Sequence, residues 1–171
     1  MKVEHLPYYT CEDYAKWQGN WELIEGIPYA KALSTRLHQR FVFRLQRLIV
    51  QTLEEKQCPC EVLSEVDWVL SEDTVLRPDI SVLCDGGNED YIRETPVLIV
   101  EVVSKASKKH DERTKFEIYQ ELGVPYYILL YPEEKILKAY RNTSEGYVPL
   151  ENLRFSIKEC LIELKEEEIW R

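Results

Sequence analysis

Apolar side chains recur at helical spacing along a long stretch in the first third of the chain. Between about residues 35 and 56 they fall on one stripe, which predicts an amphipathic helix. The stripe consists of Leu37, Phe41, Leu45, Leu48, Ile49 and Leu53. A second helix is predicted after Ser107, a suitable N-cap, and is expected to end at Gly123. Its expected buried face contains Phe116, Ile118, Tyr119 and Leu122.

Other apolar runs are short and rich in β-branched residues, which predicts strands. They cover residues 61–70, 75–83, 97–103, 125–131 and 136–141. A hairpin turn at residues 132–135 joins the last two, and residues 84–95 form a loop. Near the start, Thr10 and Asp13 open a short helix, and two strands flank Glu25-Gly26 as a hairpin. The pattern predicts an α/β fold: a mixed sheet flanked by helices, with an N-terminal β hairpin.

The composition is that of an ordinary globular protein, which we place in one domain, residues 1–171. Apolar residues make up 44% of the chain and charged residues 31%, and the length allows a substantial core. No stretch approaches the roughly 18 apolar residues of a membrane span. The opening segment, Met1–Pro7, lacks the apolar core of a signal peptide. We therefore expect a cytoplasmic protein that has no membrane partner.

Cysteine usage gives little sign of a metal site. The five cysteines are scattered, and Cys58 and Cys60 are separated by one residue, whereas common zinc knuckles have two or more. No second pair follows, and no cysteine stands in a recognisable nucleophile context. We expect reduced, packed thiols, in keeping with a cytoplasmic location.

The charge is negative overall but unevenly distributed. A net charge of −9 argues against loose, non-specific binding to nucleic acid. Residues 31–57, however, carry six lysines and arginines against two glutamates, a local charge of +4. A basic face of this kind can still bind a phosphate backbone, so the charge pattern permits such a partner without requiring it.

The most informative single residue is Glu101, because it stands inside the apolar run Val97–Val103. Such a run is typical of a strand covered on both faces, where an unpaired carboxylate would be costly. Glu101 shares a strand face with Ile99 and lies near the C-terminal end, where α/β folds tend to place their chemistry. Asp79 lies at the start of the preceding strand. Two carboxylates on neighbouring strands are a common way to hold Mg²⁺ for phosphate chemistry.

Further residues could complete such a site. Lys115 aligns with Asp111 on the second helix and could reach the carboxylates across the sheet. His38 could contribute from the first helix, and Glu22 from the hairpin. Each candidate also has a structural alternative. These are Arg77 as a partner of Glu101, a turn or cap role for Asp79, a snorkelling position for Lys115, a core-edge position for His38, and solvent exposure for Glu22.

The order and spacing of these residues resemble those of a known protein family. Pro78-Asp79 followed by Glu101 in an apolar strand is similar to the PD-(D/E)XK nuclease signature on its α-β-β-β-α-β core. More narrowly, the chain resembles the bacterial Uma-type restriction endonuclease family, long described as a domain of unknown function. The matching pieces are residues 21–26, His38, residues 77–82, residues 100–104 and residues 111–119. One departure is that the superfamily lysine, two residues after the acidic residue, is replaced by Val103; the role maps to Lys115, with Lys105 as the fallback.

The resemblance implies a restriction-endonuclease-like domain that hydrolyses phosphodiester bonds in DNA with Mg²⁺ or Mn²⁺. Asp79 and Glu101 would hold the metal, aided by the Val102 carbonyl, and Lys115 would position the nucleophile. Contacts to DNA would come from Arg36, Arg40, Arg44, Lys108 and Lys109. Two alternatives stay open: a catalytically silent nuclease-like protein that serves as an interaction module, and a metal-dependent hydrolase of small phosphodiesters. A homodimer is compatible with each of these three interpretations.

Overall fold

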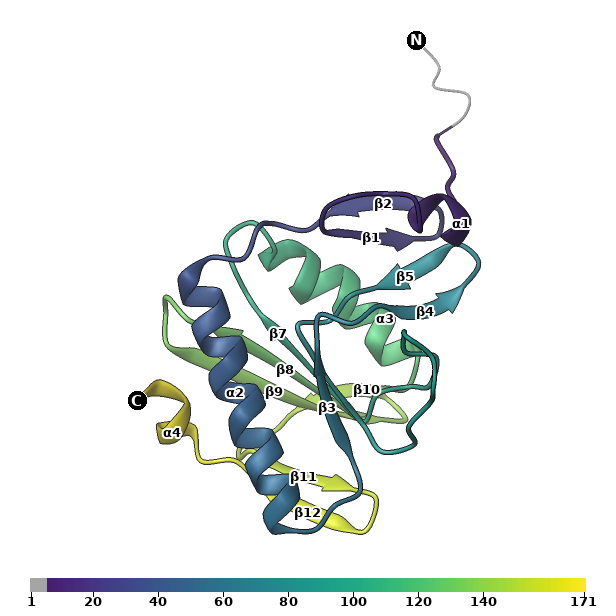
Figure 1. The fold of residues 1–171 in the computed structure, drawn as a ribbon. Helices are drawn as coiled ribbons and strands as arrows, with labels where there is room; N and C mark the ends of the chain where they lie inside the picture. Colours follow the sequence, from purple (N-terminus) through teal and green to yellow (C-terminus); the bar gives the residue numbers. More distant parts are fainter. Residues whose placement is uncertain (1–5) are drawn as a thin grey trace.

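A six-stranded mixed sheet forms the centre of the protein (Figure 1), in a computed structural model that describes residues 6–171. The first five residues of the opening segment, in which we expect no signal peptide, lie outside this range. The strand order is β10-β9-β8-β7-β6-β3, and only β7 and β8 are parallel neighbours within this sheet. The strands are β3 (Glu61–Ser64), β6 (Ile80–Leu83), β7 (Leu98–Val102), β8 (Tyr126–Tyr131), β9 (Ile136–Thr143) and β10 (Gly146–Pro149).

Helices cover both faces of this sheet. The long helix α2 (Arg36–Glu55) buries the predicted apolar stripe against one face, and the Thr35 side chain caps it by accepting a hydrogen bond from the His38 N–H. Helix α3 (Lys115–Glu121) follows a π-helical turn, η1 (His110–Thr114), and packs on the opposite face. The order α2, β3, β6, β7, α3, β8 agrees with the predicted order of elements. Within residues 6–171, no helix combines the length and apolar character needed to span a membrane.

The N-terminal hairpin belongs to a second, four-stranded sheet, which the sequence pattern did not predict. This sheet has the order β2-β1-β5-β4. Its strands are β1 (Trp21–Ile24), β2 (Ile27–Ala30), β4 (Trp68–Ser71) and β5 (Thr74–Leu76), and the short helix α1 (Cys11–Tyr14) precedes them with the expected capping box. The predictions of single strands over 61–70 and 75–83 were therefore wrong. The left-handed backbone of Glu65 (φ 55°) separates β3 from β4, and Pro78, which lacks an N–H donor, lies between β5 and β6.

The second predicted helix begins differently from the expectation. The expected cap by the Ser107 side chain is not formed: the Ser104 hydroxyl accepts from the Ser107 N–H and the Ser107 hydroxyl accepts from the Ser104 N–H, which closes a turn before the helix, and no side chain of the described residues caps η1 itself. Its buried line is Asp111, Lys115 and Tyr119, whereas Leu122 is exposed. The buried face is therefore displaced from the apolar stripe toward charged residues, because this face of the helix meets the carboxylates of the sheet.

The C-terminal segment forms a two-stranded sheet, β11 (Arg154–Ile157) and β12 (Cys160–Glu163), followed by the short helix α4 (Glu166–Trp170). Helix α4 packs against α2, where Arg44 donates a hydrogen bond to the Ile169 carbonyl and Trp170 meets Phe41 edge to face. This contact occupies one of the arginines expected to bind DNA.

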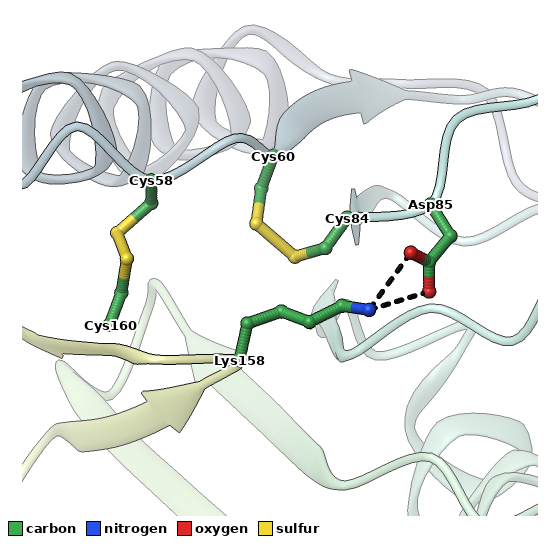
Figure 2. Close-up of a disulfide and its surroundings, with 6 residues drawn as sticks. All are labelled: Cys58, Cys60, Cys84, Asp85, Lys158 and Cys160. Atoms are coloured by element: carbon green, nitrogen blue, oxygen red, sulfur yellow. Dashed lines mark hydrogen bonds and ion pairs between the residues drawn. A yellow bond between two sulfur atoms is a disulfide. The ribbon is translucent and has the colours of Figure 1, made fainter.

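Four cysteines form two disulfides, so the expectation of reduced thiols was wrong. Cys58 pairs with Cys160, and Cys60 pairs with Cys84 (Figure 2). Cys11 is free. The spacing of Cys58 and Cys60 concealed this pairing because each partner is distant in sequence. Cys60 lies opposite Cys84 by continuation of the β3–β6 register, and Cys58 reaches the C-terminal hairpin from the end of α2. The Cys58–Cys160 disulfide thereby ties the C-terminal hairpin to the end of α2, beside the Lys158–Asp85 ion pair.

We expect the Cys160→Ser substitution to lower the free energy of unfolding by about 2–5 kcal/mol, because the Cys58–Cys160 bond closes a long loop in the unfolded chain. Urea denaturation without reductant measures this change. Cys11→Ser is the control, since Cys11 forms no disulfide. In the native oxidised protein iodoacetamide should label one thiol. Labelling of all five cysteines without reductant would contradict the pairing.

Candidate active site

Five charged residues are almost completely buried at the junction of the two sheets and helix α3. Glu22, Asp79, Glu101, Asp111 and Lys115 are each at most 3% exposed. In the same order, they belong to β1, to the position just before β6, to β7, to the η1 turn and to the start of α3. All five line a cleft of about 850 Å³. Such a concentration of buried charge is expensive for a fold, which marks the cleft as a candidate functional site.

Asp79 and Glu101 lie on neighbouring antiparallel strands. The β6–β7 register pairs Ile80 with Val100, and one further residue sets Asp79 opposite Glu101. The Asp79 carboxylate accepts a hydrogen bond from the Val102 N–H at 2.7 Å, which ties it to the strand that carries Glu101. The prediction that Glu101 lies on the same strand face as Ile99 is confirmed, since both face the α3 side of the sheet.

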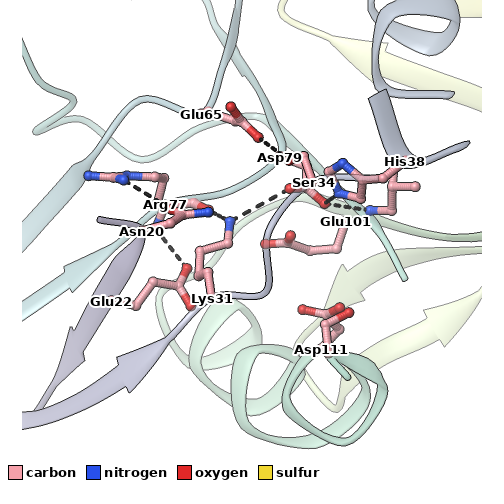
Figure 3. A network of polar contacts seen from close by, with 12 residues as sticks. Asn20, Glu22, Lys31, Ser34, His38, Glu65, Arg77, Asp79, Glu101 and Asp111 are labelled. Carbon is pink, nitrogen blue, oxygen red and sulfur yellow. Dashed lines mark hydrogen bonds and ion pairs between the residues drawn. The ribbon is translucent and has the colours of Figure 1, made fainter. Parts of the chain in front are cut away.

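Two side chains approach Asp79 from outside the sheet. The His38 Nε2 lies 3.2 Å from Asp79 Oδ2, and the Lys31 Nζ lies 3.6 Å from Asp79 Oδ1 (Figure 3). His38 comes from the first turn of α2, as the sequence suggested it could. Lys31 comes from the segment between β2 and α2. No sequence motif around Lys31 predicted that it would lie beside Asp79.

Glu101 is held by two donors from α3. The Lys115 Nζ and the Tyr119 hydroxyl both donate to Glu101 Oε1, at 2.9 and 2.8 Å. The two donors are four residues apart and therefore lie on one side of the helix. Because both groups donate to Oε1, the second carboxylate oxygen of Glu101, Oε2, is available to another partner in the cleft.

Lys115 is enclosed by carboxylates. Its Nζ lies 2.9 Å from Glu22 Oε1, 2.9 Å from Glu101 Oε1 and 3.7 Å from Asp111 Oδ1.

Glu22 also accepts from the Arg77 N–H, and its other oxygen lies 3.1 Å from His110 Nε2. Glu22 is thus buried, not exposed as the structural alternative held. Asp111 could have been found from its i, i+4 relation to Lys115, whereas nothing in the sequence indicated His110.

The surroundings of these acids shift their pKa values in different directions. Burial opposes ionisation of Asp79, but the hydrogen bond to His38 and the charge of Lys31 outweigh it and hold the pKa of Asp79 well below its usual range. Burial also acts on Glu22, yet Lys115 and His110 lower the pKa of Glu22 to about 2. At Glu101 burial prevails over the attraction of Lys115, and with the charges of Asp79 and Asp111 it raises the pKa to about 8. The hydrogen bond to Asp79 raises the pKa of His38 against the opposing effect of burial.

The donor set around Asp79 fits a divalent cation. His38, Glu65 and Asp79 each offer one ligand atom, and these atoms lie within 4.8 Å of one another. On the other side, Asp79 and Glu101 face each other across the two strands. Carboxylate oxygens suit Mg²⁺ and Mn²⁺, and an imidazole favours Mn²⁺ or a later transition metal. Glu65 was missed in the sequence because it stands in a turn after β3 with no motif around it.

The remaining candidates lie at the rim or outside the cleft. Lys105 lines the rim but is exposed, and its Nζ lies 4.0 Å from Glu133. Arg36, Arg40, Lys108 and Lys109 are exposed near the two helix starts beside the cleft. Arg44 is directed to the C-terminal helix instead.

Comparison with solved structures places this fold in a class. A solved structure from Anabaena variabilis ATCC 29413, described as "a putative nuclease belonging to DUF820", superimposes with a TM-score of 0.73 over 95% of this chain and 97% of that chain. The sequence identity is 17%, so this similarity concerns the fold. The protein has a mixed α/β fold of this class.

The family follows from the sequence match. Residues 11–161 match the model of the Uma2 family, described as "Putative restriction endonuclease", and the chain belongs to this family. Two uncharacterized proteins of Synechocystis sp. (strain ATCC 27184 / PCC 6803 / Kazusa) are similar: slr1290 is 25% identical over 120 residues and sll1609 is 29% identical over 105 residues. These matches cover 67% and 58% of this chain. They cover 63% and 58% of the two relatives, so the chain spans about three-fifths of their length.

We expect Lys115→Met to lower the free energy of unfolding by about 3–5 kcal/mol, because it leaves buried carboxylates without their cation. Urea denaturation at pH 7 measures this loss. Lys105→Met is the matched control: its side chain is 89% exposed, and the substitution should change stability by less than about 0.5 kcal/mol. Equal stability of the two variants would contradict the role of Lys115 as the buried counter-ion.

Proposed function

We propose that the protein is a metal-dependent endonuclease with a restriction-endonuclease-like core, and that it hydrolyses phosphodiester bonds in DNA. The observation that carries this proposal is the pair Asp79 and Glu101, set opposite each other on adjacent strands and buried in a cleft. Lys115, bound to Glu101, supplies the third member of the expected set. Membership of the Uma2 family supports the same reaction class.

In this proposal Asp79 and Glu101 hold Mg²⁺ or Mn²⁺, with the Val102 carbonyl beside them and His38 and Glu65 on the far side of Asp79. When bound, the cation supplies Lewis-acid chemistry: it lowers the pKa of a bound water and neutralises charge on the phosphate. The protein residues hold this arrangement in place. The Val102 N–H and His38 orient Asp79, while Lys115 and Tyr119 orient Glu101.

We propose DNA as the substrate because exposed lysines, Lys105 and Lys109, line the cleft of an otherwise acidic protein and further cationic residues lie nearby. Arg36, Arg40, Lys108 and Lys109 are exposed on the two helix starts that flank the cleft. Charge confined to one region lets a protein of net charge −9 bind a polyanion locally. The family description points to the same class of substrate.

The test is nicking of supercoiled plasmid with Mg²⁺ or Mn²⁺. We expect Asp79→Asn and Glu101→Gln each to lower the cleavage rate by about a thousand-fold or more, since each removes a metal ligand that supplies several kcal/mol of transition-state stabilisation. Asp85→Asn is the matched control, because Asp85 is an exposed aspartate paired with Lys158 away from the cleft. It should cut at the wild-type rate.

Cleavage retained by Asp79→Asn would overturn the proposed site. If the wild type raises its melting temperature with Mn²⁺ but cuts neither plasmid nor linear DNA, the site binds metal without hydrolysing DNA. The choice then lies between a silent interaction module and a hydrolase of small phosphodiesters.

Metal binding should strengthen as the pH rises toward about 8. Without metal Glu101 has a pKa raised to about 8 and is protonated in most molecules at pH 6.5, so a cation must displace a proton there. Above pH 8 the carboxylate is already ionised, and affinity should level off. Calorimetric titration with Mn²⁺ at pH 6.5, 7.5 and 8.5 measures both affinity and proton release. The steep dependence should disappear in Glu101→Gln, and affinity independent of pH in the wild type would refute the role of Glu101.

A further inference from the structure

Four lysines, Lys31, Lys105, Lys109 and Lys115, line the cleft, and they differ in how much of each ammonium group is available to a ligand. Lys109, like Lys105, is exposed, and it forms no ion pair with any of the five buried charged residues. Lys115 is 1% exposed, Lys31 has 15% of its side chain exposed, and Lys105 has 89% exposed. An ammonium group has three N–H donors. The partners of each group therefore show which lysine can still donate to a substrate.

The Lys115 ammonium has no N–H donor available for a substrate. Its ammonium faces three carboxylates, those of Glu22, Glu101 and Asp111, at 2.9, 2.9 and 3.7 Å. To contact a phosphate, it would have to leave one of these acids buried and unpaired, which is costly. Lys115 therefore acts on the reaction through Glu101, as a positioning residue.

Lys105 has free donors but the wrong position. Its Nζ reaches Glu133 at 4.0 Å, on the exposed rim of the cleft. No ion pair links it to any of the five buried charged residues. It can attract a polyanion to the rim, but it does not meet the carboxylate pair.

Lys31 has both the position and a free donor. Its ammonium donates to the Arg77 carbonyl and lies 3.6 Å from Asp79 Oδ1, and the side chain lines the cleft (Figure 3). Its backbone is fixed because the Lys31 N–H donates to the Asn20 carbonyl at 2.8 Å. The side chain is thus anchored beside Asp79, with one N–H still open to the cleft.

We propose that Lys31 is the catalytic lysine of this protein, donating a hydrogen bond to a non-bridging oxygen of the phosphate that is cut. This assignment rests on the proposed function. During hydrolysis the oxygen of water forms a new bond to phosphorus, and the bond from phosphorus to the leaving oxygen breaks. The proton lost by the water passes to solvent, and the leaving oxygen takes one up. Lys31 takes no part in these proton transfers and stabilises the charge that develops on the phosphoryl oxygens.

The experiment compares Lys31→Gln with the wild type in two assays. In single-turnover cleavage of a duplex oligonucleotide with Mg²⁺, we expect a rate about 100-fold lower, typical of the loss of one donor to the transition state. In binding of the same duplex with Ca²⁺ in place of Mg²⁺, we expect weaker affinity and a salt dependence reduced by about one phosphate contact. Lys31→Arg should recover part of both, because it restores a charged donor.

Lys16→Gln is the matched control: it removes one positive charge from an exposed lysine of the same N-terminal region, outside the cleft lining. It should cut at the wild-type rate. A Lys31→Gln protein that cuts like the wild type, or that binds with unchanged affinity and salt dependence, overturns the assignment of Lys31 while the proposed nuclease stands. A wild type that neither cuts nor binds DNA overturns the proposed function, and the role of Lys31 with it.

Discussion

The arrangement of the site depends on one buried ammonium group. Lys115 joins Glu22 of the small sheet, Glu101 of the central sheet and Asp111 of the η1 turn, all within 3.7 Å. These three acids belong to three different elements of the fold, and the lysine ammonium joins them at one point. Burying such a cluster is no efficient route to stability, since apolar residues of similar volume would serve as well or better. Its retention is better explained by the chemistry of the cleft that it borders.

The same cluster separates two carboxylates that differ in charge state. Asp79 is ionised over the whole neutral range because His38 and Lys31 favour its charged form. Glu101 retains its proton more strongly because burial outweighs Lys115. A cation entering the cleft therefore meets one ready ligand and one that must lose a proton. For the proposed metal site, this asymmetry would make cation binding sensitive to pH, through Glu101 more than through Asp79.

Sequence reasoning selected two of the acids that the structure buries in the cleft, but not the residues around them. Asp79 and Glu101 could be predicted because strand periodicity and an isolated acid in an apolar run are local signals. Lys31, Glu65 and His110 could not, since they reach the cleft from turns and loops whose paths depend on tertiary contacts. The same limit applies to the fold: the helix, strand and helix order was predicted, whereas the second sheet was missed. That error arose because apolar runs continue through the breaks at Glu65 and Pro78, where the chain passes from one sheet to the other.

The departure at Val103 now has a physical explanation. In the superfamily signature a lysine occupies this position, on the same strand face as Glu101. Here Val103 is 7% exposed and packs in the apolar cluster with Tyr119 beneath α3. A lysine at 103 would place a second ammonium on the face that Lys115 already neutralises from the helix. The charge beside Glu101 is thus supplied from α3, and under the proposed function a cation that faces the substrate would come from another element. The segment after β2 supplies such a cation, because it brings Lys31 to Asp79 from an element other than the helix that carries Lys115.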